Sequence, residues 1–330
     1  MRITGDVLNE ELSAPLATYE TPLWPSTARG ARLSMAGGGI AVTIARDGMS
    51  RSILLEAPTS AEATRCAQAI CADRQGLANV VASTTCYGSL QDLHWEVTGS
   101  LLFLRIEMQT GDAAGHNMVT GAADAAMTWI LERYPALKYV SISGNYCTDK
   151  KPSAVNGILG RGKHVVAEML VPDELCHKRL RTTPAAVANL NTKKNLLGTS
   201  LAGGVRSANA HFANMLLALY LATGQDAANI VEGSQGYTFA EEREGDLYFS
   251  VTLPNVIVGT VGNGKDLAFV QENLRRLGCL EPREPGENAR RLAALVGATV
   301  LCGELSLLAA QATPGELMRA HRRLERKRDE

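Results

Sequence analysis

The sequence predicts an α+β fold, in which a large helix-rich domain surrounds a long central helix and a smaller α+β unit lies within the chain. Two observations lead to this prediction. Strand-like and helix-like segments alternate between residues 52 and 141, as in a small α+β domain. The longest apolar helical stretch runs from Ser207 to Glu232, and a helix that is apolar on most sides is usually buried. A chain of 330 residues can bury such a core in one or two domains.

The composition is ordinary for a soluble protein, with 45% hydrophobic and 20% charged residues. A formal net charge of -1 gives no reason to expect a nucleic-acid partner. The longest apolar run that we identify, Met215–Thr223, is about half the length needed to span a membrane, so no membrane partner is expected. Seven cysteines without a CxxC pair and an acidic N-terminus favour a cytoplasmic protein with reduced thiols. The histidines show no metal-ligand spacing, so we expect no metal site.

The elements before residue 142 follow from periodicity and turn residues. The predicted elements are strands at 40–45, at 79–83 and within 90–108, and helices at 59–73 and 112–131. Ser60 is a plausible N-cap of the first helix. After the central stretch, alternation predicts a strand over Asp246–Gly259, and an apolar run predicts a helix over Asn288–Ala312.

The segment SGNYCTDKKP, from Ser143 to Pro152, is the most informative motif. It follows a strand-like run and ends in a turn restricted by proline. If the segment is extended, Lys150 and Lys151 point in opposite directions, so that one can face a reacting carbonyl while the other binds an anion. Taken alone, the pattern is more typical of a solvated loop with a local ion pair.

Several long segments resemble one family in the same order. They are SGNYCTDKKPSAVNGILGRGK (143–163), KKNLLGTSLAG (193–203), NAHFANMLLALYLATGQDAANIVEGS (209–234), DLYFSVTLPNVIVGTVGNGKDL (246–267) and LCGELSLLAA (301–310), with GDAAGHNMVTGAAD (111–124) upstream. Together they resemble the catalytic portion of 3-hydroxy-3-methylglutaryl-coenzyme A (HMG-CoA) reductase, from about Pro15 to His321. Motifs of this length in the same order make coincidence implausible.

The resemblance implies a more detailed organisation. Residues 1–51 and 142–330 would form a large domain that binds substrate and coenzyme A, and residues 52–141 an inserted small ferredoxin-like domain that binds NAD(P). It also implies reduction of HMG-CoA to mevalonate and coenzyme A with NADPH or NADH. The active sites would lie at the interface of a homodimer or a higher homo-oligomer.

The resemblance assigns catalytic roles to four residues. Lys150 takes the position of the family's lysine, whose ammonium group stabilises negative charge on the former thioester oxygen. Asp226 matches the aspartate that keeps this lysine charged. Glu20 matches the glutamate that protonates the alkoxide, although the residues at 22–25, PLWP, are unusual for the family. His321 matches the histidine that protonates the coenzyme A thiolate.

The remaining matches are binding positions. Those for the substrate are Arg51, Ser143, Asp149, Lys151, Lys194 and Asn214; those for coenzyme A are Arg29 and Arg32; those for the dinucleotide are Asp112, Gly115, His116, Asn117, Gly262 and Gly264. The dinucleotide positions include the start of a predicted helix, where free backbone N–H groups attract phosphate. The two later glycines allow a close approach of the backbone to a ligand.

One geometric conflict concerns Asn214 and Asp226. They are 12 residues apart, about 18 Å along a straight helix, so a single straight helix cannot bring both to one five-carbon acid. Either the helix breaks near Gly224, or the site is assembled from two chains as the resemblance implies.

Departures from the family bear on the cofactor and on assembly. Ala114 and His116 replace methionines of the cofactor motif, and Cys86 replaces an arginine that NADPH-using relatives place near the 2′-phosphate. The use of NADH is therefore a hypothesis, in which Lys265 is the residue that could compensate for the lost charge. The segment before Glu20 is short for the family's dimer segment, so we expect different dimer contacts.

Two alternatives to the biosynthetic reading stay open. The same enzyme could run in the oxidative, mevalonate-degrading direction with NAD, because sequence cannot set direction. A non-catalytic HMG-CoA-binding homologue is the other, and the joint presence of the four catalytic matches argues against it.

Overall fold

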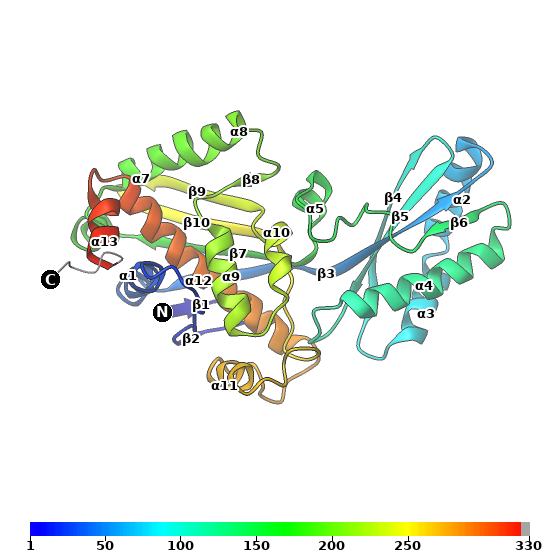
Figure 1. The fold of residues 1–330 in the computed structure, drawn as a ribbon, viewed down its shortest axis with the longest axis horizontal. Coiled ribbons are helices and arrows are strands. Elements are labelled where there is room, and N and C mark those ends of the chain that lie inside the picture. Colours follow the sequence, from blue (N-terminus) through cyan, green and yellow to red (C-terminus); the bar gives the residue numbers. More distant parts are fainter. Residues whose placement is uncertain (325–330) are drawn as a thin grey trace.

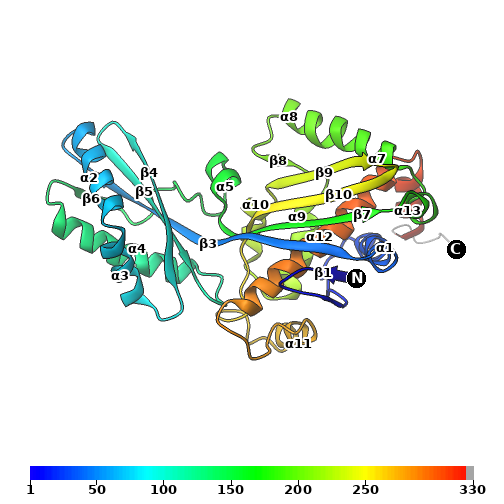
Figure 2. The ribbon, with the colours of Figure 1, turned by 180° about the vertical axis from the view of Figure 1, so that it is seen from behind.

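The computed structural model describes residues 1–324, and for Ala320, His321, Arg323 and Leu324 it describes the backbone alone. The chain forms two lobes, which the long strand β3 (Ile40–Glu56) joins by running from one into the other (Figures 1 and 2). β3 pairs with β1 and β7 in the larger lobe and with β5 and β6 in the smaller lobe, so that one sheet continues through both.

The larger lobe is built on a mixed sheet with the strand order β2-β1-β3-β7-β10-β9-β8. Its strands besides β3 are β1 (Arg2–Thr4), β2 (Glu10–Glu11), β7 (Gly162–Val171), β8 (Ser207–Ala208), β9 (Gly236–Arg243) and β10 (Asp246–Val256). β7 pairs antiparallel with both β3 and β10, which places three long strands at the centre of the sheet.

Helices cover this sheet and connect its strands. The α-helices of the larger lobe are α1 (Leu23–Ala36), α5 (Ala154–Leu159), α6 (Asp173–Leu175), α7 (Pro184–Leu190), α8 (Thr199–Leu201), α9 (Phe212–Ala222), α10 (Ile230–Gly233), α11 (Ala268–Arg276), α12 (Glu287–Gln311) and α13 (Glu316–Leu324). Cys176–Leu180 and Asn191–Gly198 are π-helical, and Ala227–Asn229 is a 3₁₀ turn.

The smaller lobe has the chain order β3-α2-α3-β4-β5-α4-β6 and the strand order β6-β3-β5-β4, with every pair antiparallel. Its further elements are α2 (Ser60–Ala72), α3 (Arg74–Thr84), β4 (Ser89–Thr98), β5 (Leu101–Gln109), α4 (His116–Arg133) and β6 (Lys138–Ser141). A separate hydrophobic core, drawn from residues between Ile53 and Leu137, packs its helices onto the sheet.

The central helix of the larger lobe is α12, and not the stretch 207–232 that the sequence suggested. α12 packs on β3, β7, β10 and α1, and 94% of its most apolar 18-residue window is buried, so this membrane-length helix is a core helix of the fold. The predicted long helix instead begins at Phe212 and ends at Ala222. It ends there because Gly224 has a φ of 64°, a left-handed conformation that terminates helices.

Two smaller expectations are also corrected. Residues 79–83 belong to α3, because Asp73 caps that helix by accepting the N–H of Gly76, so the run Val80-Val81 is helical and not a strand. Thr59, and not Ser60, is the N-cap of α2, since its hydroxyl accepts the N–H of Glu62.

Candidate active site

The loop Ser143–Pro152 leaves the smaller lobe after β6 and enters the larger lobe at α5 (Figure 1). It is not extended as expected: Asn145, Thr148 and Lys150 have φ values of 59°, 43° and 56°. Left-handed conformations at residues other than glycine cost energy, most of all at a β-branched threonine, and they cluster at functional sites. The loop keeps this shape through Asn156, whose side-chain amide donates to the carbonyls of Cys147 and Thr148 at 2.9 and 3.0 Å.

Lys150 and Asp226 form the ion pair that the sequence resemblance implied. Lys150 Nζ lies 2.9 Å from Asp226 Oδ2, and the two side chains are 39% and 46% exposed, so a ligand can reach them. The hydrogen bond with Asp226 raises the pKa of Lys150 against the opposing effect of burial. Burial opposes a low pKa at Asp226, but the bonds from Lys150 and from the N–H of Ala228 outweigh it and lower that pKa. Both groups therefore stay charged at neutral pH.

A buried ionic cluster lies beneath this pair. Arg161 Nη1 lies 2.8 Å from Asp149 Oδ1 and 3.1 Å from Glu232 Oε1, and the side chains of Arg161 and Glu232 are fully buried. His116 Nε2 lies 3.9 Å from the same Asp149 oxygen. Burial and the nearby Arg161 lower the pKa of His116, so its imidazole is neutral at neutral pH.

Sequence reasoning missed Arg161 and Glu232. They are 71 residues apart and match no spacing rule, and the only available signal was the position of Arg161 inside the longest family-like segment.

The structure also gathers several predicted substrate-binding residues around the loop. Arg51, on β3, donates twice to Thr120 Oγ1 of α4, and its Nη1 lies 3.4 Å from Ser143 Oγ. Lys151 Nζ donates to the carbonyl of Asp149 at 3.0 Å. These cations and the hydroxyl thus sit on the loop or beside it, at the junction of the lobes.

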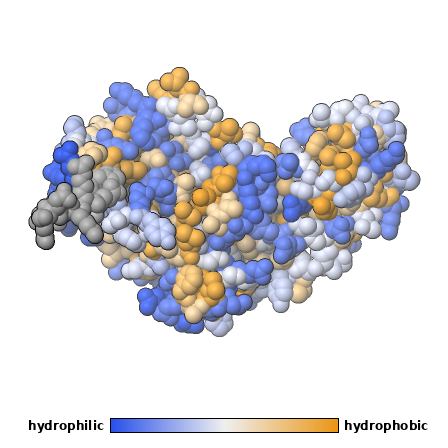
Figure 3. Space-filling model, viewed as in Figure 1, coloured by the Kyte–Doolittle hydropathy of each residue, from blue (hydrophilic) through white to orange (hydrophobic). Residues whose placement is uncertain are grey.

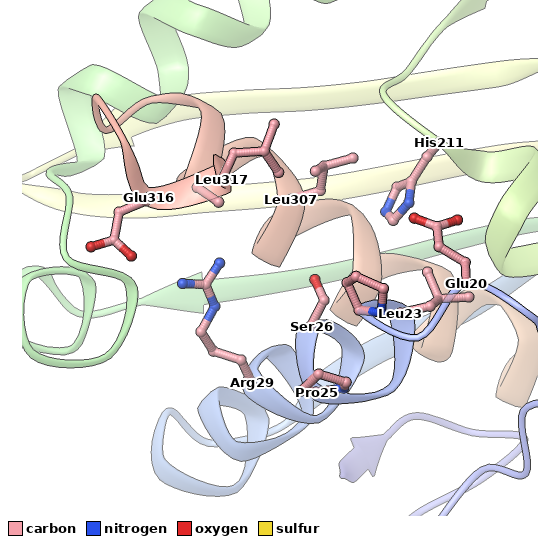
Figure 4. Close-up of a pocket in the computed structure, with 11 residues that line it drawn as sticks. Glu20, Leu23, Pro25, Ser26, Arg29, His211, Leu307, Glu316 and Leu317 are labelled. Atoms are coloured by element: carbon pink, nitrogen blue, oxygen red, sulfur yellow. The ribbon is translucent and has the colours of Figure 1, made fainter. Parts of the chain in front are cut away.

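Glu20 and Asn214 lie together in a second cluster at the other end of α9. Asn214 Nδ2 donates to Glu20 Oε2 at 2.8 Å, and Glu20 and His211 line the same cavity of about 200 Å³ (Figure 4). The fully buried Glu304 fixes His211. Glu304 Oε2 accepts a hydrogen bond from the backbone N–H of His211 at 3.0 Å and lies 3.9 Å from Nε2 of its ring. His211 is a further residue that sequence reasoning set aside, since it was tested only for metal-ligand spacing.

Of the two predicted coenzyme A residues, Arg29 borders this second cluster. It lines the cavity and donates to Ser306, while Arg32 is exposed on the same helix, α1. Lys194 is half-buried, donates to Asn195 Oδ1 at 2.9 Å, and has its pKa lowered by burial. His321 lies on α13, but its side chain is outside the described residues.

The helix does break near Gly224, as one of the two alternatives for Asn214 and Asp226 requires. The break does not bring the two clusters together, so it does not by itself resolve the conflict. Asn214 and Ala222 are still separated by about 12 Å of helix, and no contact joins Glu20 to Lys150 or Asp226 among the described residues.

The predicted dinucleotide segments lie side by side, because a bridge between Ala113 and Val261 joins them. No side chain caps the N-terminus of α4, which begins at His116 after Gly115 with a φ of 96°, so its first N–H groups are free for a phosphate. Asn117 is exposed there, and a Cβ at Gly262 would meet no atom within 4 Å. The residues present therefore fit a dinucleotide.

Two predicted cofactor contacts look different in the structure. Asp112 uses its carboxylate to accept the N–H of Ala289 at 2.9 Å, which fastens the loop to the first turn of α12. Lys265 is only 6% exposed and donates to the carbonyl of Gly224, so it is not placed on the surface to replace a charge lost at Cys86. Gly264, just before it, has a φ of 81°.

Fold and site together define a two-lobed enzyme in which a lysine–aspartate pair and a free helix N-terminus face the junction of the lobes. The family model for hydroxymethylglutaryl-coenzyme A reductase matches residues 1–326, and the chain belongs to this family.

Relatives named 3-hydroxy-3-methylglutaryl-coenzyme A reductase support this. The protein of Aeropyrum pernix is 46% identical over 99% of this chain and 77% of its own length. The protein of Pyrococcus abyssi is 45% identical over 99% of this chain and 80% of its own length. A reductase structure from Streptococcus pneumoniae has a TM-score of 0.74 at 19% identity, covering 95% of this chain and 73% of its own. Another from that organism, bound to NADPH in open conformations, has a TM-score of 0.71 at 18% identity, over 94% and 83%.

Proposed function

We propose that this protein is an HMG-CoA reductase that converts the thioester of HMG-CoA to the alcohol of mevalonate and releases coenzyme A. The observation that carries the proposal is the Lys150–Asp226 ion pair, 2.9 Å long and open to a ligand, in a chain that belongs to this family. When bound, the reduced nicotinamide supplies a hydride in each of two steps.

The residues of the chain supply charge and protons. The Lys150 ammonium stabilises the negative charge that develops on the thioester oxygen and later on the aldehyde oxygen. Asp226 keeps that ammonium charged through the direct bond. Glu20 donates the proton that makes the alcohol, and His321 protonates the departing thiolate, whose ordinary pKa of about 8.5 would otherwise favour reverse attack. We assign the free carboxylate of the substrate to Arg51, Ser143 and Lys151 of the first cluster, together with Lys194.

Steady-state kinetics test the proposal. Purified protein is mixed with HMG-CoA and a reduced cofactor, and the loss of absorbance of the nicotinamide is compared with the release of thiol. We expect two reduced cofactors to be consumed for each thiol released. No oxidation that depends on the thioester, with either cofactor, would contradict the proposal. Oxidation of mevalonate by NAD in the presence of coenzyme A tests the reverse, degradative direction on the same enzyme.

We also propose that NADH is an effective cofactor, because the exposed Cys86 offers no cation to a 2′-phosphate and Lys265 is buried. Charge-assisted bonds to a phosphate are among the strongest hydrogen bonds in proteins, so their loss removes the main advantage of NADPH. The ratio of kcat/KM for the two cofactors measures this, and a large preference for NADPH would contradict it.

The domain division and the assembly are part of the same proposal. Residues 52–141 would be a ferredoxin-like, cofactor-binding domain. Its chain order β-α-α-β-β-α-β differs from the ferredoxin-like order only by the second helix after β3, and its strand order β6-β3-β5-β4 and separate core support the proposal. We propose a cytoplasmic homodimer or higher homo-oligomer in which Glu20 of one chain completes the Lys150 site of another. The distance between the two clusters supports this, as do exposed apolar residues over α9, including Leu217 and Leu221 (Figure 3).

A further inference from the structure

The buried cluster beneath Lys150 has an unbalanced charge. One cation, Arg161, lies between two carboxylates, those of Asp149 and Glu232. Asn229 Nδ2 donates to Glu232 Oε1 at 2.9 Å, and this is the oxygen that also accepts from Arg161. An ionised carboxylate can only accept hydrogen bonds, so both contacts suit a charged Glu232. Fully buried charges are costly unless they are paired, and removing one partner is more costly still. A costly cluster that includes the residue before Lys150 therefore suggests a functional role.

The cluster is tied to the strained loop on both sides of Lys150. Asp149, the preceding residue, is bound to Arg161. Burial raises the pKa of Glu232, and the nearby Arg161, the side chain of Asn229 and the backbone amide of Lys150 act against this rise. The loop holds three left-handed residues, of which Lys150 is one, so it needs such external bonds to keep its shape.

The cluster acts on the Lys150 side chain through the position of the loop. The bond of 2.9 Å between Lys150 Nζ and Asp226 Oδ2 is the main cause of the raised pKa of Lys150. That bond forms only while the loop holds Lys150 in this place.

We propose that the Arg161–Glu232 pair is a positioning device for the reaction: it fixes the Lys150 loop through Asp149 and so holds the Lys150 ammonium group against Asp226. This inference rests on the proposed function for its catalytic consequence, although its effect on the bond between Lys150 and Asp226 is measured without turnover. Glu232 and Arg161 are positioning residues, because neither is exposed to a ligand.

The ionisable groups that face this site come from four segments of the chain. They are Asp149, Lys150 and Lys151 of the loop, His116 of α4, Arg161 before β7, and Tyr220, Asp226 and Glu232 of the segment from α9 to α10. His116 is neutral and burial raises the pKa of Tyr220 above the physiological range, so the carboxylates and the three cations set the local charge.

Glu232→Gln is the principal variant, because it keeps an oxygen for Arg161 and Asn229 and removes only the charge. Competitive labelling of amines with acetic anhydride between about pH 7 and about pH 12, read by mass spectrometry at Lys150, gives the pKa of that side chain. We expect this pKa to fall, because a loop without its anchor no longer holds Lys150 Nζ at 2.9 Å from Asp226 Oδ2. We expect kcat to fall about tenfold, with a smaller change in KM. In the pH profile of kcat, the decline on the alkaline side should begin at a lower pH.

Three further variants separate this role from a loss of packing. Glu168→Gln changes a carboxylate on β7, the strand that follows Arg161, at about 20 Å from the start of that strand. It should leave the titration of Lys150 and kcat unchanged. Glu232→Asp keeps the charge and should hold the pKa of Lys150 near that of the wild type. Asp226→Asn removes the direct partner and should lower that pKa more than Glu232→Gln does.

The titration of Lys150 decides the inference. An unchanged pKa in Glu232→Gln, equal to that of Glu168→Gln, would overturn it while the proposed function stands. If the wild type shows no reductase activity but the pKa of Lys150 falls in Glu232→Gln, the proposed function fails and the positioning role remains. Should Glu232→Gln not fold, the double variant with Arg161→Gln removes both buried charges. Wild-type kcat in that double variant would also overturn the inference. Asp149 would have lost its ion pair with Arg161, yet the loop would still position Lys150 for the reaction.

Discussion

Lys150 and Asp226 shift each other's pKa values in opposite directions, which keeps an ammonium group available throughout the neutral range. The direct hydrogen bond is the main cause of the raised pKa of Lys150. An oxyanion that forms beside this pair meets a cation that is already in place, so little reorganisation is needed as the reaction proceeds.

Lys265 shows the opposite effect of burial, which lowers its pKa from 10.5 to about 8. Between those values the unfolded chain binds a proton that the folded chain has released, so the free energy of unfolding rises with pH in this window. We predict that the wild type gains up to about 3 kcal/mol relative to Lys265→Met between pH 8 and 10.5. Denaturant unfolding of both proteins at several pH values measures this, and parallel pH curves would contradict it.

At this scale, the sequence predicted the residues that match long motifs, and the pairing of Lys150 with Asp226 is confirmed. It could not predict that Arg161 and Glu232 lie beneath them. Such contacts depend on the meeting of β7 with the turn after α9, and residues far apart in the chain carry no spacing that reveals it.

The break between α9 and the 3₁₀ turn Ala227–Asn229 is the element that positions Asp226. Asp226 caps that turn by accepting the N–H of Ala228, and Gly224 allows the reversal with its φ of 64°. Two anchors hold the turn in place. Lys265 donates to the carbonyl of Gly224, and the side chain of Gln225 bonds to both the N–H and the carbonyl of Gly259. A single continuous helix would have carried Asp226 away from the loop.

Gly224→Ala tests this element. A Cβ there would lie 2.8 Å from the carbonyl oxygen of Gly264 and 2.9 Å from the methyl groups of Val270, in addition to the strain of a positive φ. We predict a loss of about 1–3 kcal/mol in unfolding free energy together with a fall of at least about tenfold in kcat.

Gly245→Ala is the matched control, because Gly245 has a φ of 93° but no atom within 4 Å of the added Cβ. It should lose stability and keep kcat. A Gly224→Ala enzyme with normal kcat would show that the turn does not position Asp226.

Composition explains which elements were predictable. The strands within 90–108 and the helix at 288–312 are confirmed within a few residues as β4, β5 and α12. The stretches 207–232 and 288–312 are both apolar, so composition alone could not show which of them lies against the sheet. β-branched residues favoured a strand at 79–83, but the cap at Asp73 and packing on α4 made it helical.

The whole molecule carries its candidate catalytic groups in two clusters, one at each end of α9. The strand β3 links the lobes as one continuous element, so the division at residue 51 falls inside a strand that pairs in both lobes. Sequence periodicity places such a boundary poorly, because a strand shared by two lobes has no break in its pattern.

Mixing two inactive variants tests whether two chains share one site. We predict that Glu20→Gln and Lys150→Ala are each inactive as pure proteins. When they are refolded together in equal amounts, the mixture should regain about one quarter of wild-type activity, since half of the dimers are mixed and each contains one intact site. If mixed dimers form but the mixture regains no activity, Glu20 and Lys150 act in a site made by a single chain.

The central claim is that the ammonium group of Lys150 stabilises the oxyanion of thioester reduction. The most direct measurement is the kcat of Lys150→Ala with HMG-CoA and a reduced nicotinamide, together with its Kd for coenzyme A by calorimetry. We predict that turnover is lost while binding of coenzyme A survives, because Arg29 and the cavity beside it are untouched. Turnover at the wild-type rate in this variant would contradict the account.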